Sequence, residues 1–417
     1  MNNYLFTMNL IFWLLLLYNL ILTIAGLIYR FKTKNRVKLG PEEYPDIDIF
    51  IPCHNEGVVI QDTLNAMAKI RYEGILNIYV LNDNSSDDTG KIAKIFDETY
   101  SFIHHIEVPE PKEGEPRGKS RVLNYGLSIS NGEYFVVYDA DNQPNSDAVS
   151  RLIEITKRTD RAVGAVGTVR TINTEVNLLT RFISIEFQAF QLSMQSGRFY
   201  LHKVGSLPGT NMLLKRSVLE EVGGYDPKAL AEDAELTIRL ASKGHLIAVD
   251  PYSQTWEQEP QDLKSLIKQR TRWLQGNLYV MSKFFKEPTW WSTLCFAHLF
   301  YYKATYVLFT SLLLVSNSIF VLGLFGILKI ETVFPYTTSV CFTYFVYTMQ
   351  LVCAVWFDKT LSSKTLIAIS LMYFSYAQLF IYLLLRSIYV LYKDKKNGIV
   401  SWDKTSRNKV NNQNLST

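Results

Sequence analysis

The hydrophobic and polar positions divide the chain into apolar stretches at its two ends and a mixed region between them. The apolar stretches cover residues 11–29, 296–327, 334–357 and 366–391. A helix needs about 20 apolar residues to cross a bilayer, so each stretch is a candidate membrane segment. From Asp46, short β-branched runs alternate with amphipathic ones, which indicates an α/β fold with a largely parallel sheet.

The first apolar stretch is predicted to be a membrane anchor. A signal peptide is disfavoured because no basic region precedes the stretch and no small-residue cleavage site follows it. Basic residues follow it directly, namely Arg30, Lys32, Lys34, Arg36 and Lys38. The positive-inside rule assigns these residues, and the next roughly 250, to the cytoplasm.

The three apolar stretches near the carboxyl end leave the topology open. Three crossings would put the tail outside, whereas Lys393, Lys395, Lys396 and Lys404 argue for the cytoplasm. One stretch could be interfacial or re-entrant, and residues 285–300 are predicted to form a helix on the membrane surface. The expected parts are a membrane helix (1–30), a cytoplasmic domain (36–284), interfacial and membrane helices (285–392) and a cytoplasmic tail (393–417).

Composition narrows the function classes. The four cysteines show neither a disulfide framework nor a metal-ligand spacing. A net charge of +4 is too small to indicate a nucleic-acid partner, and the basic residues gather beside the membrane segments.

A predicted strand at residues 134–138 delivers Asp139 and Asp141 at its carboxyl end. Open α/β sheets bind ligands in the crevice outside such strand ends. Mg²⁺ is typically held by one or two carboxylates while substrate phosphates complete its shell. The pair therefore predicts a nucleotide diphosphate carried on a metal, with a solvated turn as the alternative for an isolated Asp-x-Asp.

Two more predicted strands end in polar loops. The strand at 47–51 leads to Pro52 and Glu56, and Glu56 begins a helix predicted for 58–70, where it could meet a ribose hydroxyl. The strand at 76–81 leads to Asp83, an acceptor for uracil or ribose. Helix capping and dipole complementarity explain the same residues structurally.

Lys119 lies in a basic segment, Arg117 to Ser120, that opens a helix predicted to continue through Leu127. A basic side chain and free amides at a helix amino end suit a phosphate, while surface exposure is the ordinary alternative. Gly114 is one residue too close to Gly118 for a Walker loop, which disfavours an ATPase.

Asp233 opens a helix predicted to run to about Lys243. It is a candidate general base, although the helix dipole favours a carboxylate there in any case. A further helix, predicted for 265–280, carries Gln269-Arg270-Thr271-Arg272-Trp273, where Arg270 and Trp273 are neighbours. The guanidinium can neutralise a pyrophosphate, and the indole beside it offers an apolar surface on which a sugar can stack. The alternative is that this segment is an amphipathic helix at the membrane.

In their order, these motifs resemble those of the processive family 2 glycosyltransferases, the membrane synthases of cellulose, hyaluronan, chitin and poly-N-acetylglucosamine. The matching residues span most of the chain: Pro52 to Glu56, Asp83, Asp139 to Asp141, Glu232 with Asp233, and Gln269 to Trp273. The Gln-x-x-Arg-Trp pattern is the specific one, because Asp-x-Asp occurs in many nucleotide-sugar enzymes.

The resemblance implies a GT-A domain in which Asp83 contacts uracil, Asp139 the nucleotide and Asp141 the metal, with Asp233 as catalytic base. The further residues that it implies are Pro52, Glu56, Lys119, Gln269, Arg270 and Arg272 for the nucleotide-sugar, Glu232 and Trp273 for the acceptor, and Trp402, Thr405 and Arg407 for a gating loop. Two departures are Ala231, where the family often has Thr, and Asn82, where it often has Asp. The single leading membrane segment is closer to the poly-N-acetylglucosamine and nodulation-type synthases than to cellulose synthases.

These features predict a plasma-membrane, multi-pass, inverting and processive enzyme that polymerises a β-linked polysaccharide from a UDP-sugar, UDP-GlcNAc or UDP-glucose, with Mg²⁺ or Mn²⁺. A homo-oligomer or an accessory secretion subunit could form the export path. Two alternatives stay open. One is a non-processive enzyme that glycosylates a lipid such as diacylglycerol or a polyprenyl phosphate; the other is a catalytically silent subunit.

Overall fold

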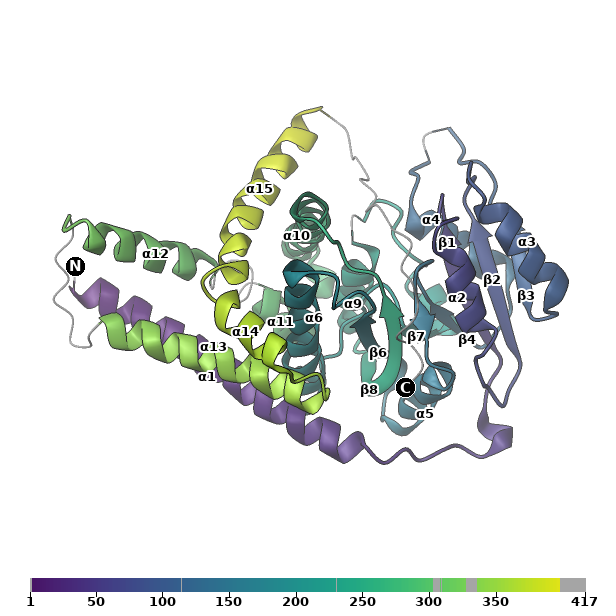
Figure 1. Ribbon diagram of the computed structural model, residues 1–417. Helices are drawn as coiled ribbons and strands as arrows, with labels where there is room; N and C mark the ends of the chain where they lie inside the picture. Colours follow the sequence, from purple (N-terminus) through teal and green to yellow (C-terminus); the bar gives the residue numbers. More distant parts are fainter. Residues whose placement is uncertain are drawn as a thin grey trace.

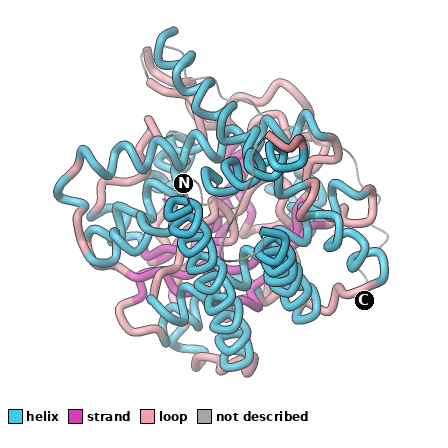
Figure 2. Tube along the Cα trace, turned by 90° about the vertical axis from the view of Figure 1, so that its left-hand side faces the viewer, coloured by secondary structure: helices cyan, strands magenta, loops and turns pink. Residues whose placement is uncertain are grey.

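A computed structural model describes residues 2–113, 115–229, 231–302, 308, 310–327 and 336–397 (Figure 1). Its centre is a sheet, and apolar helices extend from one side: α1 (Asn2–Thr33), α12 (Thr310–Leu324) and α13 (Tyr336–Phe357). Figure 2 is seen from that side, and helices lie over the strands in it. The residues predicted for the gating loop, Trp402, Thr405 and Arg407, fall outside the described part of the chain.

The sheet has eight strands in the order β3-β2-β1-β4-β7-β6-β8-β5. Strands β1 to β4 are parallel neighbours, β7 is antiparallel to β4 and β6, and β6 is parallel to β8. The sheet is therefore mixed and mostly parallel, which confirms the predicted α/β class. The strands are β1 (Ile47–Cys53), β2 (Leu76–Asn82), β3 (Ile103–Glu107), β4 (Tyr134–Val137), β5 (Gln143–Pro144), β6 (Ala162–Thr171), β7 (Met212–Lys215) and β8 (Leu246–Glu257).

Both faces of the sheet centre are covered. Successive residues of a strand point to opposite faces, yet Ile49, Phe50 and Ile51 of β1 are all fully buried. Parallel strands need such two-sided cover, which explains why β4 is apolar throughout and why β1 is apolar apart from the buried Asp48. The helices of this part are α2 (Ile60–Met67), α3 (Thr89–Thr99), α4 (Lys119–Ile129), α5 (Ala148–Arg158), α6 (Leu178–Phe190), α7 (Arg198–His202), α8 (Arg216–Glu221) and α9 (Glu232–Ser242).

A glycine brings α4 close to the strands that carry the predicted site. A Cβ on Gly126 would lie 2.7 Å from Leu81 Cδ1 and 3.3 Å from Phe50 Cδ1, so no larger residue fits without a shift. The helix therefore packs tightly over β1 and β2. Its amino end, at Lys119, is fixed relative to the strand ends.

Two expected helices have different limits. The helix predicted for 58–70 is α2, which covers only Ile60–Met67. The membrane-surface helix predicted for 285–300 is wrong as a single element. Helix α10 (Leu263–Lys286) ends before Pro288, and α11 begins at Thr293. The residue before a proline avoids the helical region, and Glu287 has φ −115° and ψ 84°. The buried Cys295 and Leu299 of α11 pack in a cluster with Ile238 of α9.

One helix segment of the described chain, Leu10–Thr33, is by itself long and apolar enough to cross a membrane. Helices α14 (Ser363–Met372) and α15 (Tyr376–Asn397) meet the same test only as a pair bent by 46°. The shorter apolar segments are Leu313–Gly323 and Cys341–Phe357.

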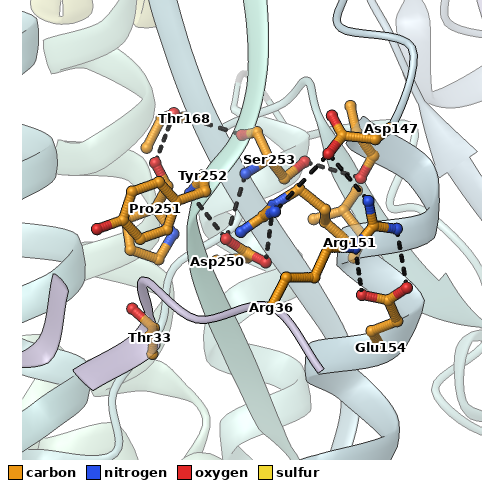
Figure 3. A network of polar contacts seen from close by, with 12 residues as sticks. Thr33, Arg36, Asp147, Arg151, Glu154, Thr168, Asp250, Pro251, Tyr252 and Ser253 are labelled. Carbon is orange, nitrogen blue, oxygen red and sulfur yellow. Dashed lines mark hydrogen bonds and ion pairs between the residues drawn. The ribbon is translucent and has the colours of Figure 1, made fainter. Parts of the chain in front are cut away.

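A network of hydrogen bonds attaches the segment that follows α1 to the sheet domain (Figure 3). Arg36 donates two hydrogen bonds of 2.8 Å to the carboxylate of Glu154 and one of 3.0 Å to Asp147. The Tyr44 hydroxyl donates to the same Glu154, at 2.6 Å. Because a bidentate arginine fixes orientation as well as distance, α1 enters the domain in a defined direction.

Candidate active site

The loops after β1 and β2 meet at one edge of the sheet, as predicted for parallel neighbours. The Asp83 amide donates to the Cys53 carbonyl at 2.8 Å, and His54 Nδ1 lies 2.6 Å from the Asp83 carbonyl oxygen. The Glu56 amide donates to the Thr89 hydroxyl at 2.7 Å. The β1 loop and the β2 loop are thus one connected surface.

The Asp83 carboxylate is oriented by α4. Arg121 of that helix contacts Asp83 Oδ1 and donates to the Pro109 carbonyl at 2.7 Å. Asn84 also donates to Asp83 Oδ1, at 3.1 Å. Arg121 was not predicted as a site residue; its signal in the sequence is a second basic residue in the first turn of the helix that Lys119 opens. Arg117, by contrast, pairs with Glu110 at the exposed surface.

Lys119 connects three parts of the predicted site. Its Nζ donates to Asp139 Oδ1 at 2.7 Å and to the Gly209 carbonyl at 2.6 Å, and it lies 3.5 Å from Glu232 Oε1. Burial pushes the pKa of Lys119 down, but the carboxylates of Asp139 and Glu232 raise it by more, so the net shift is upward. The ammonium remains charged among several carboxylates.

Asp233 lies in the first turn of α9, beside Gly209. Its Oδ1 accepts a hydrogen bond of 2.7 Å from the Ala234 amide. A Cβ on Gly209 would lie 3.1 Å from Asp233 Oδ2, and Gly209 has φ +84°, a conformation that favours glycine. The absence of a side chain at position 209 leaves the second carboxylate oxygen close to the backbone of the loop before β7.

Burial, and after it the nearby Glu232 carboxylate, raise the pKa of Asp233 to about 7, although Lys119 acts to lower it. A general base works best with a pKa near the operating pH, because it then accepts a proton readily and is largely deprotonated beforehand. The environment of Asp233 suits proton transfer at neutral pH.

The turn after β4 is held by a buried hydrogen-bond network. The Asp139 amide donates to Thr210 Oγ1 at 3.1 Å, and Thr210 Oγ1 donates to Asn142 Oδ1 at 3.0 Å. Asp141 is only 4% exposed, whereas the Asp139 side chain is 38% exposed. The two carboxylates predicted as a pair therefore differ in their access to solvent.

No group of three or more His, Cys, Asp or Glu residues in the described ranges is arranged to hold a metal by itself. Asp141 and Asp139 nevertheless supply hard oxygen donors at a strand end, the donor type that Mg²⁺ and Mn²⁺ prefer. This donor set fits such an ion only when phosphate oxygens of a nucleotide complete the coordination.

Helix α10 crosses the start of α9 at very short range. A Cβ on Gly276 would lie 2.4 Å from the Ala231 Cβ. Gln269 and Arg272 precede Gly276 by seven and four residues, so they share its face of the helix. Gln269 and Arg272 are therefore on the side of α10 that meets the start of α9, whereas the Trp273 ring lies toward α6, 6.3 Å from the Phe187 ring.

Arg270 is in a different environment from the one expected. Its guanidinium carbon lies 4.1 Å from the centre of the Trp273 ring, which confirms that the two are neighbours. However, Arg270 is only 3% exposed and pairs with Glu186 at 2.7 Å, and the Tyr376 hydroxyl donates to Glu186 at 2.6 Å. This geometry gives Arg270 a protein carboxylate as its partner and does not support the expected contact with pyrophosphate. Glu186, whose only signal was an acid within an apolar run, was missed.

Comparisons with known proteins agree with this arrangement. The family described as "Glycosyltransferase like family 2" matches residues 45–276. The chain is 40% identical over 418 residues to "Probable glycosyltransferase YdaM" of Bacillus subtilis (strain 168), covering 98% of each chain. It is 29% identical over 269 residues to the poly-beta-1,6-N-acetyl-D-glucosamine synthase of Staphylococcus aureus (strain COL), and this match spans 63% of each protein.

Among solved structures, the mannosyltransferase PcManGT from Pyrobaculum calidifontis, in complex with GDP-Man and Mn²⁺, aligns with a TM-score of 0.52 and 19% identity. The alignment covers 86% of this chain and 98% of that one, so the two chains share a fold. The family match, residues 45–276, contains the strand-end loops, Asp233 and the Gln269 segment. The chain therefore belongs to glycosyltransferase family 2 and is a hexosyltransferase.

Proposed function

We propose that this enzyme is a membrane-bound, inverting and processive glycosyltransferase that polymerises a β-linked polysaccharide from a UDP-sugar. The observation that carries the proposal is the position of Asp233. It is a half-buried carboxyl with a pKa of about 7, beside the Lys119–Asp139 ion pair and near the helix that bears Gln269 to Trp273. A base, a nucleotide edge and a sugar-stacking residue thus converge.

In the proposed reaction, Asp233 takes the proton of an acceptor hydroxyl as its oxygen attacks the anomeric carbon of the donor. The new C–O bond forms on the opposite side from the breaking bond, and UDP leaves with the electron pair. A divalent ion held by Asp141 and the diphosphate would offset charge on the leaving group. Positioning both substrates can contribute about 7–11 kcal/mol toward the barrier.

The donor site assigned here uses the surface formed by the β1 and β2 loops. Asp83, held by Arg121, would accept a hydrogen bond from the uracil ring. Pro52 and Glu56 would border the uracil and the ribose. Lys119 already neutralises Asp139 and Glu232, so it is close to the point where diphosphate charge would arrive. Gln269 and Arg272 would complete this end of the site.

The acceptor would stack on Trp273, which is 40% exposed, with Glu232 beside the base. An exposed indole suits a sugar ring, because the apolar face of the sugar packs on the indole while the sugar hydroxyls stay accessible. The 29% identity to a poly-beta-1,6-N-acetyl-D-glucosamine synthase makes UDP-GlcNAc the first donor to test, followed by UDP-glucose.

Membrane attachment is part of the proposal. Helix α1 would span the bilayer with Arg30 and Lys32 in its last turn on the cytoplasmic side. Arg36, pinned by Glu154, then holds the catalytic domain against that surface. The growing polysaccharide would leave through the membrane helices, in an oligomer or with an accessory secretion subunit.

The test is UDP release by the detergent-purified full chain with a panel of UDP-sugars and Mg²⁺ or Mn²⁺, with products sized on a gel. Asp233→Asn is expected to abolish release, whereas Asp97→Asn, a matched change on the exposed side of α3, leaves it intact. Long products support the polysaccharide synthase. Release with only short, lipid-extractable products would identify the non-processive lipid glycosyltransferase, and no release with any sugar would contradict the proposed donor.

A further inference from the structure

The guanidinium of Arg270 lies against the Trp273 ring. Its carbon atom is 4.1 Å from the centre of that ring and 5.3 Å from the centre of the Phe187 ring. Arg270 is 3% exposed, whereas Trp273 is 40% exposed. A cation within about 6 Å of a ring centre is attracted to the ring, most strongly where the cation has lost its water. The orientation of the exposed indole therefore depends on where Arg270 is held.

Glu186 of α6 fixes the position of Arg270. Its Oε2 accepts a hydrogen bond of 2.7 Å from Arg270 Nη2. The other two guanidinium nitrogens, Nε and Nη1, are buried and have no hydrogen-bond partner among the described residues. Hydrogen bonds between two charged groups are short and strong, so they define direction as well as distance. The carboxylate of Glu186 therefore sets the direction of the guanidinium.

Tyr376 holds Glu186 from a distant part of the chain. The Tyr376 hydroxyl donates to the same Oε2 atom at 2.6 Å, and Tyr376 is only 5% exposed. Tyr376 is the first residue of α15, which packs along α10 (Figure 1). Two positions later, Gln378 accepts a hydrogen bond of 2.6 Å from Asn317 of α12. The Glu186 carboxylate thus lies where the catalytic domain meets the apolar helices.

A second glutamate has the same kinds of partner. Glu154 of α5 accepts hydrogen bonds from Arg36 at 2.8 Å and from the Tyr44 hydroxyl at 2.6 Å. A buried arginine needs a negative partner in any protein, and this requirement alone explains the Glu154 cluster. The Glu186 cluster differs because its arginine lies on an exposed indole at the proposed acceptor site. Glu154 is therefore a matched control for Glu186.

We propose that Glu186 is a positioning residue for the acceptor. Through Arg270 it holds the Trp273 ring in the orientation on which the acceptor sugar stacks, and Tyr376 of α15 holds Glu186 in turn. The proposal rests on the acceptor role of Trp273 proposed above. It adds α6 and α15 to the elements that build the acceptor site, so this site is completed by a residue from the carboxyl-terminal helices.

Fluorine NMR of the detergent-purified full chain, labelled with 5-fluorotryptophan, tests the positioning directly. The chain has seven tryptophans, and Trp273→Phe identifies the resonance of position 273. Glu186→Gln removes the charge but keeps the size, and it is expected to shift or broaden that resonance. Glu154→Gln should leave the resonance in place, although Glu154 is the more buried of the two, with a side chain 3% exposed against 25%. No change in Glu186→Gln, or an equal change in Glu154→Gln, would overturn the proposal.

Tyr376→Phe decides the question if Glu186→Gln does not fold. This variant removes one hydroxyl group and leaves the ion pair between Glu186 and Arg270 in place. It should move the resonance of position 273 in the same direction as Glu186→Gln, by a smaller amount. Tyr389→Phe, a matched change on α15 at a residue that is 65% exposed, should not move it. A resonance that is the same in Tyr376→Phe and in the native chain would contradict the role given to α15.

The kinetic expectation is a change in the use of the acceptor but not of the donor. The donor is UDP-GlcNAc, and the acceptor is a β-1,6-linked N-acetylglucosamine pentasaccharide. Glu186→Gln should raise the KM of the pentasaccharide by about 2- to 10-fold, because a loosened indole must be ordered again on binding. The KM of UDP-GlcNAc should stay within about twofold of the native value by the same reasoning, since the donor does not stack on this ring. An equal rise in both KM values would overturn a role specific to the acceptor.

Failure of this proposal and failure of the proposed function give different results. If the native chain releases no UDP with any sugar, the proposed function is contradicted, and the fluorine resonance still decides whether Glu186 positions Trp273. If Glu186→Gln shifts the resonance in an active enzyme but leaves the KM of the pentasaccharide unchanged, Glu186 holds the ring, and the acceptor role of Trp273 in the proposed function is contradicted. A shifted resonance together with a raised KM supports both.

Discussion

Lys119 Nζ lies 2.7 Å from Asp139 Oδ1, and this contact joins the amino end of α4 to the end of β4. The same ammonium reaches the Gly209 carbonyl and Glu232, so one cation holds together segments that are up to 113 residues apart in sequence. It also opposes the forces that raise the pKa of Asp233. Lys119 therefore has an electrostatic role in the site as well as a structural one.

Replacing Lys119 by Met is expected to destabilise the protein by about 1–3 kcal/mol, because the partly exposed carboxylates of Asp139 and Glu232 lose a charged hydrogen-bond partner. It should also raise the pKa of Asp233 and move the acid limb of kcat/KM to higher pH. Thermal unfolding and a pH profile of UDP release measure the two effects. Lys119→Arg should restore much of both, and Lys94→Met on exposed α3 should change neither. A pH profile unaltered in Lys119→Met would contradict the electrostatic role.

The activity should fall as the pH drops through about 7, since Asp233 must be deprotonated to accept a proton and its pKa is about 7. Glu232→Gln removes a negative charge beside Asp233 and should therefore shift this fall in activity to lower pH. Asp233→Asn should lower kcat by about 10²–10⁴-fold at every pH, the usual contribution of a general base. If the activity of Glu232→Gln falls at the same pH as that of the native enzyme, the fall is due to the titration of a group other than Asp233.

The stability of the enzyme should respond to pH in the opposite sense. An unfolded aspartate titrates near pH 3.9, about three units below the folded Asp233. The folded state thus binds this proton more tightly, and the native enzyme loses stability as the pH rises from about 4 to about 7. Asp233→Asn carries no such proton. The melting temperature of the variant minus that of the native enzyme should therefore be larger at pH 8 than at pH 5. An equal difference at both values would show that burial does not raise this pKa.

Gly209→Ala separates backbone strain from contact with the base. Gly209 and Gly223 both have φ +84°, so alanine at either position should cost about 1–2 kcal/mol of stability. Only at position 209 does the new methyl group approach Asp233 Oδ2, at 3.1 Å; at position 223 nothing lies within 4 Å. Gly209→Ala is therefore expected to lose kcat, with Gly223→Ala as the matched control. Equal activity in the two variants would contradict the proximity of loop and base.

Much of the catalytic domain was predictable because strand periodicity and polar loop ends are local signals. The parallel pairing of β1 with β2, and hence the meeting of the Asp83 loop with the first loop, follows from such signals. The partners of these residues were not predictable. That Arg121 meets Asp83, or that Arg270 meets Glu186 rather than solvent, depends on how helices pack over the sheet, and the two partners are far apart in sequence.

The membrane part shows the limit of hydropathy. Residues 366–391 have the composition of a spanning helix, yet the structure breaks them into α14 and α15 and packs both against α6 and α10. Apolar content alone does not distinguish a helix surrounded by lipid from one with a protein on one side. Tertiary contacts such as Tyr376 to Glu186 supply that distinction.

The close approach of Gly276 to Ala231 sets the distance between α10, which carries Trp273, and α9, which carries Asp233. With no room for another methyl group, the separation of α9 from α10 is set by the smallest side chains available. An enzyme with the threonine that the family often has before Glu-Asp must hold its α10 farther away or rotated. If the acceptor binds between these helices as proposed, the space open to its sugar ring would depend on the volume of a single residue.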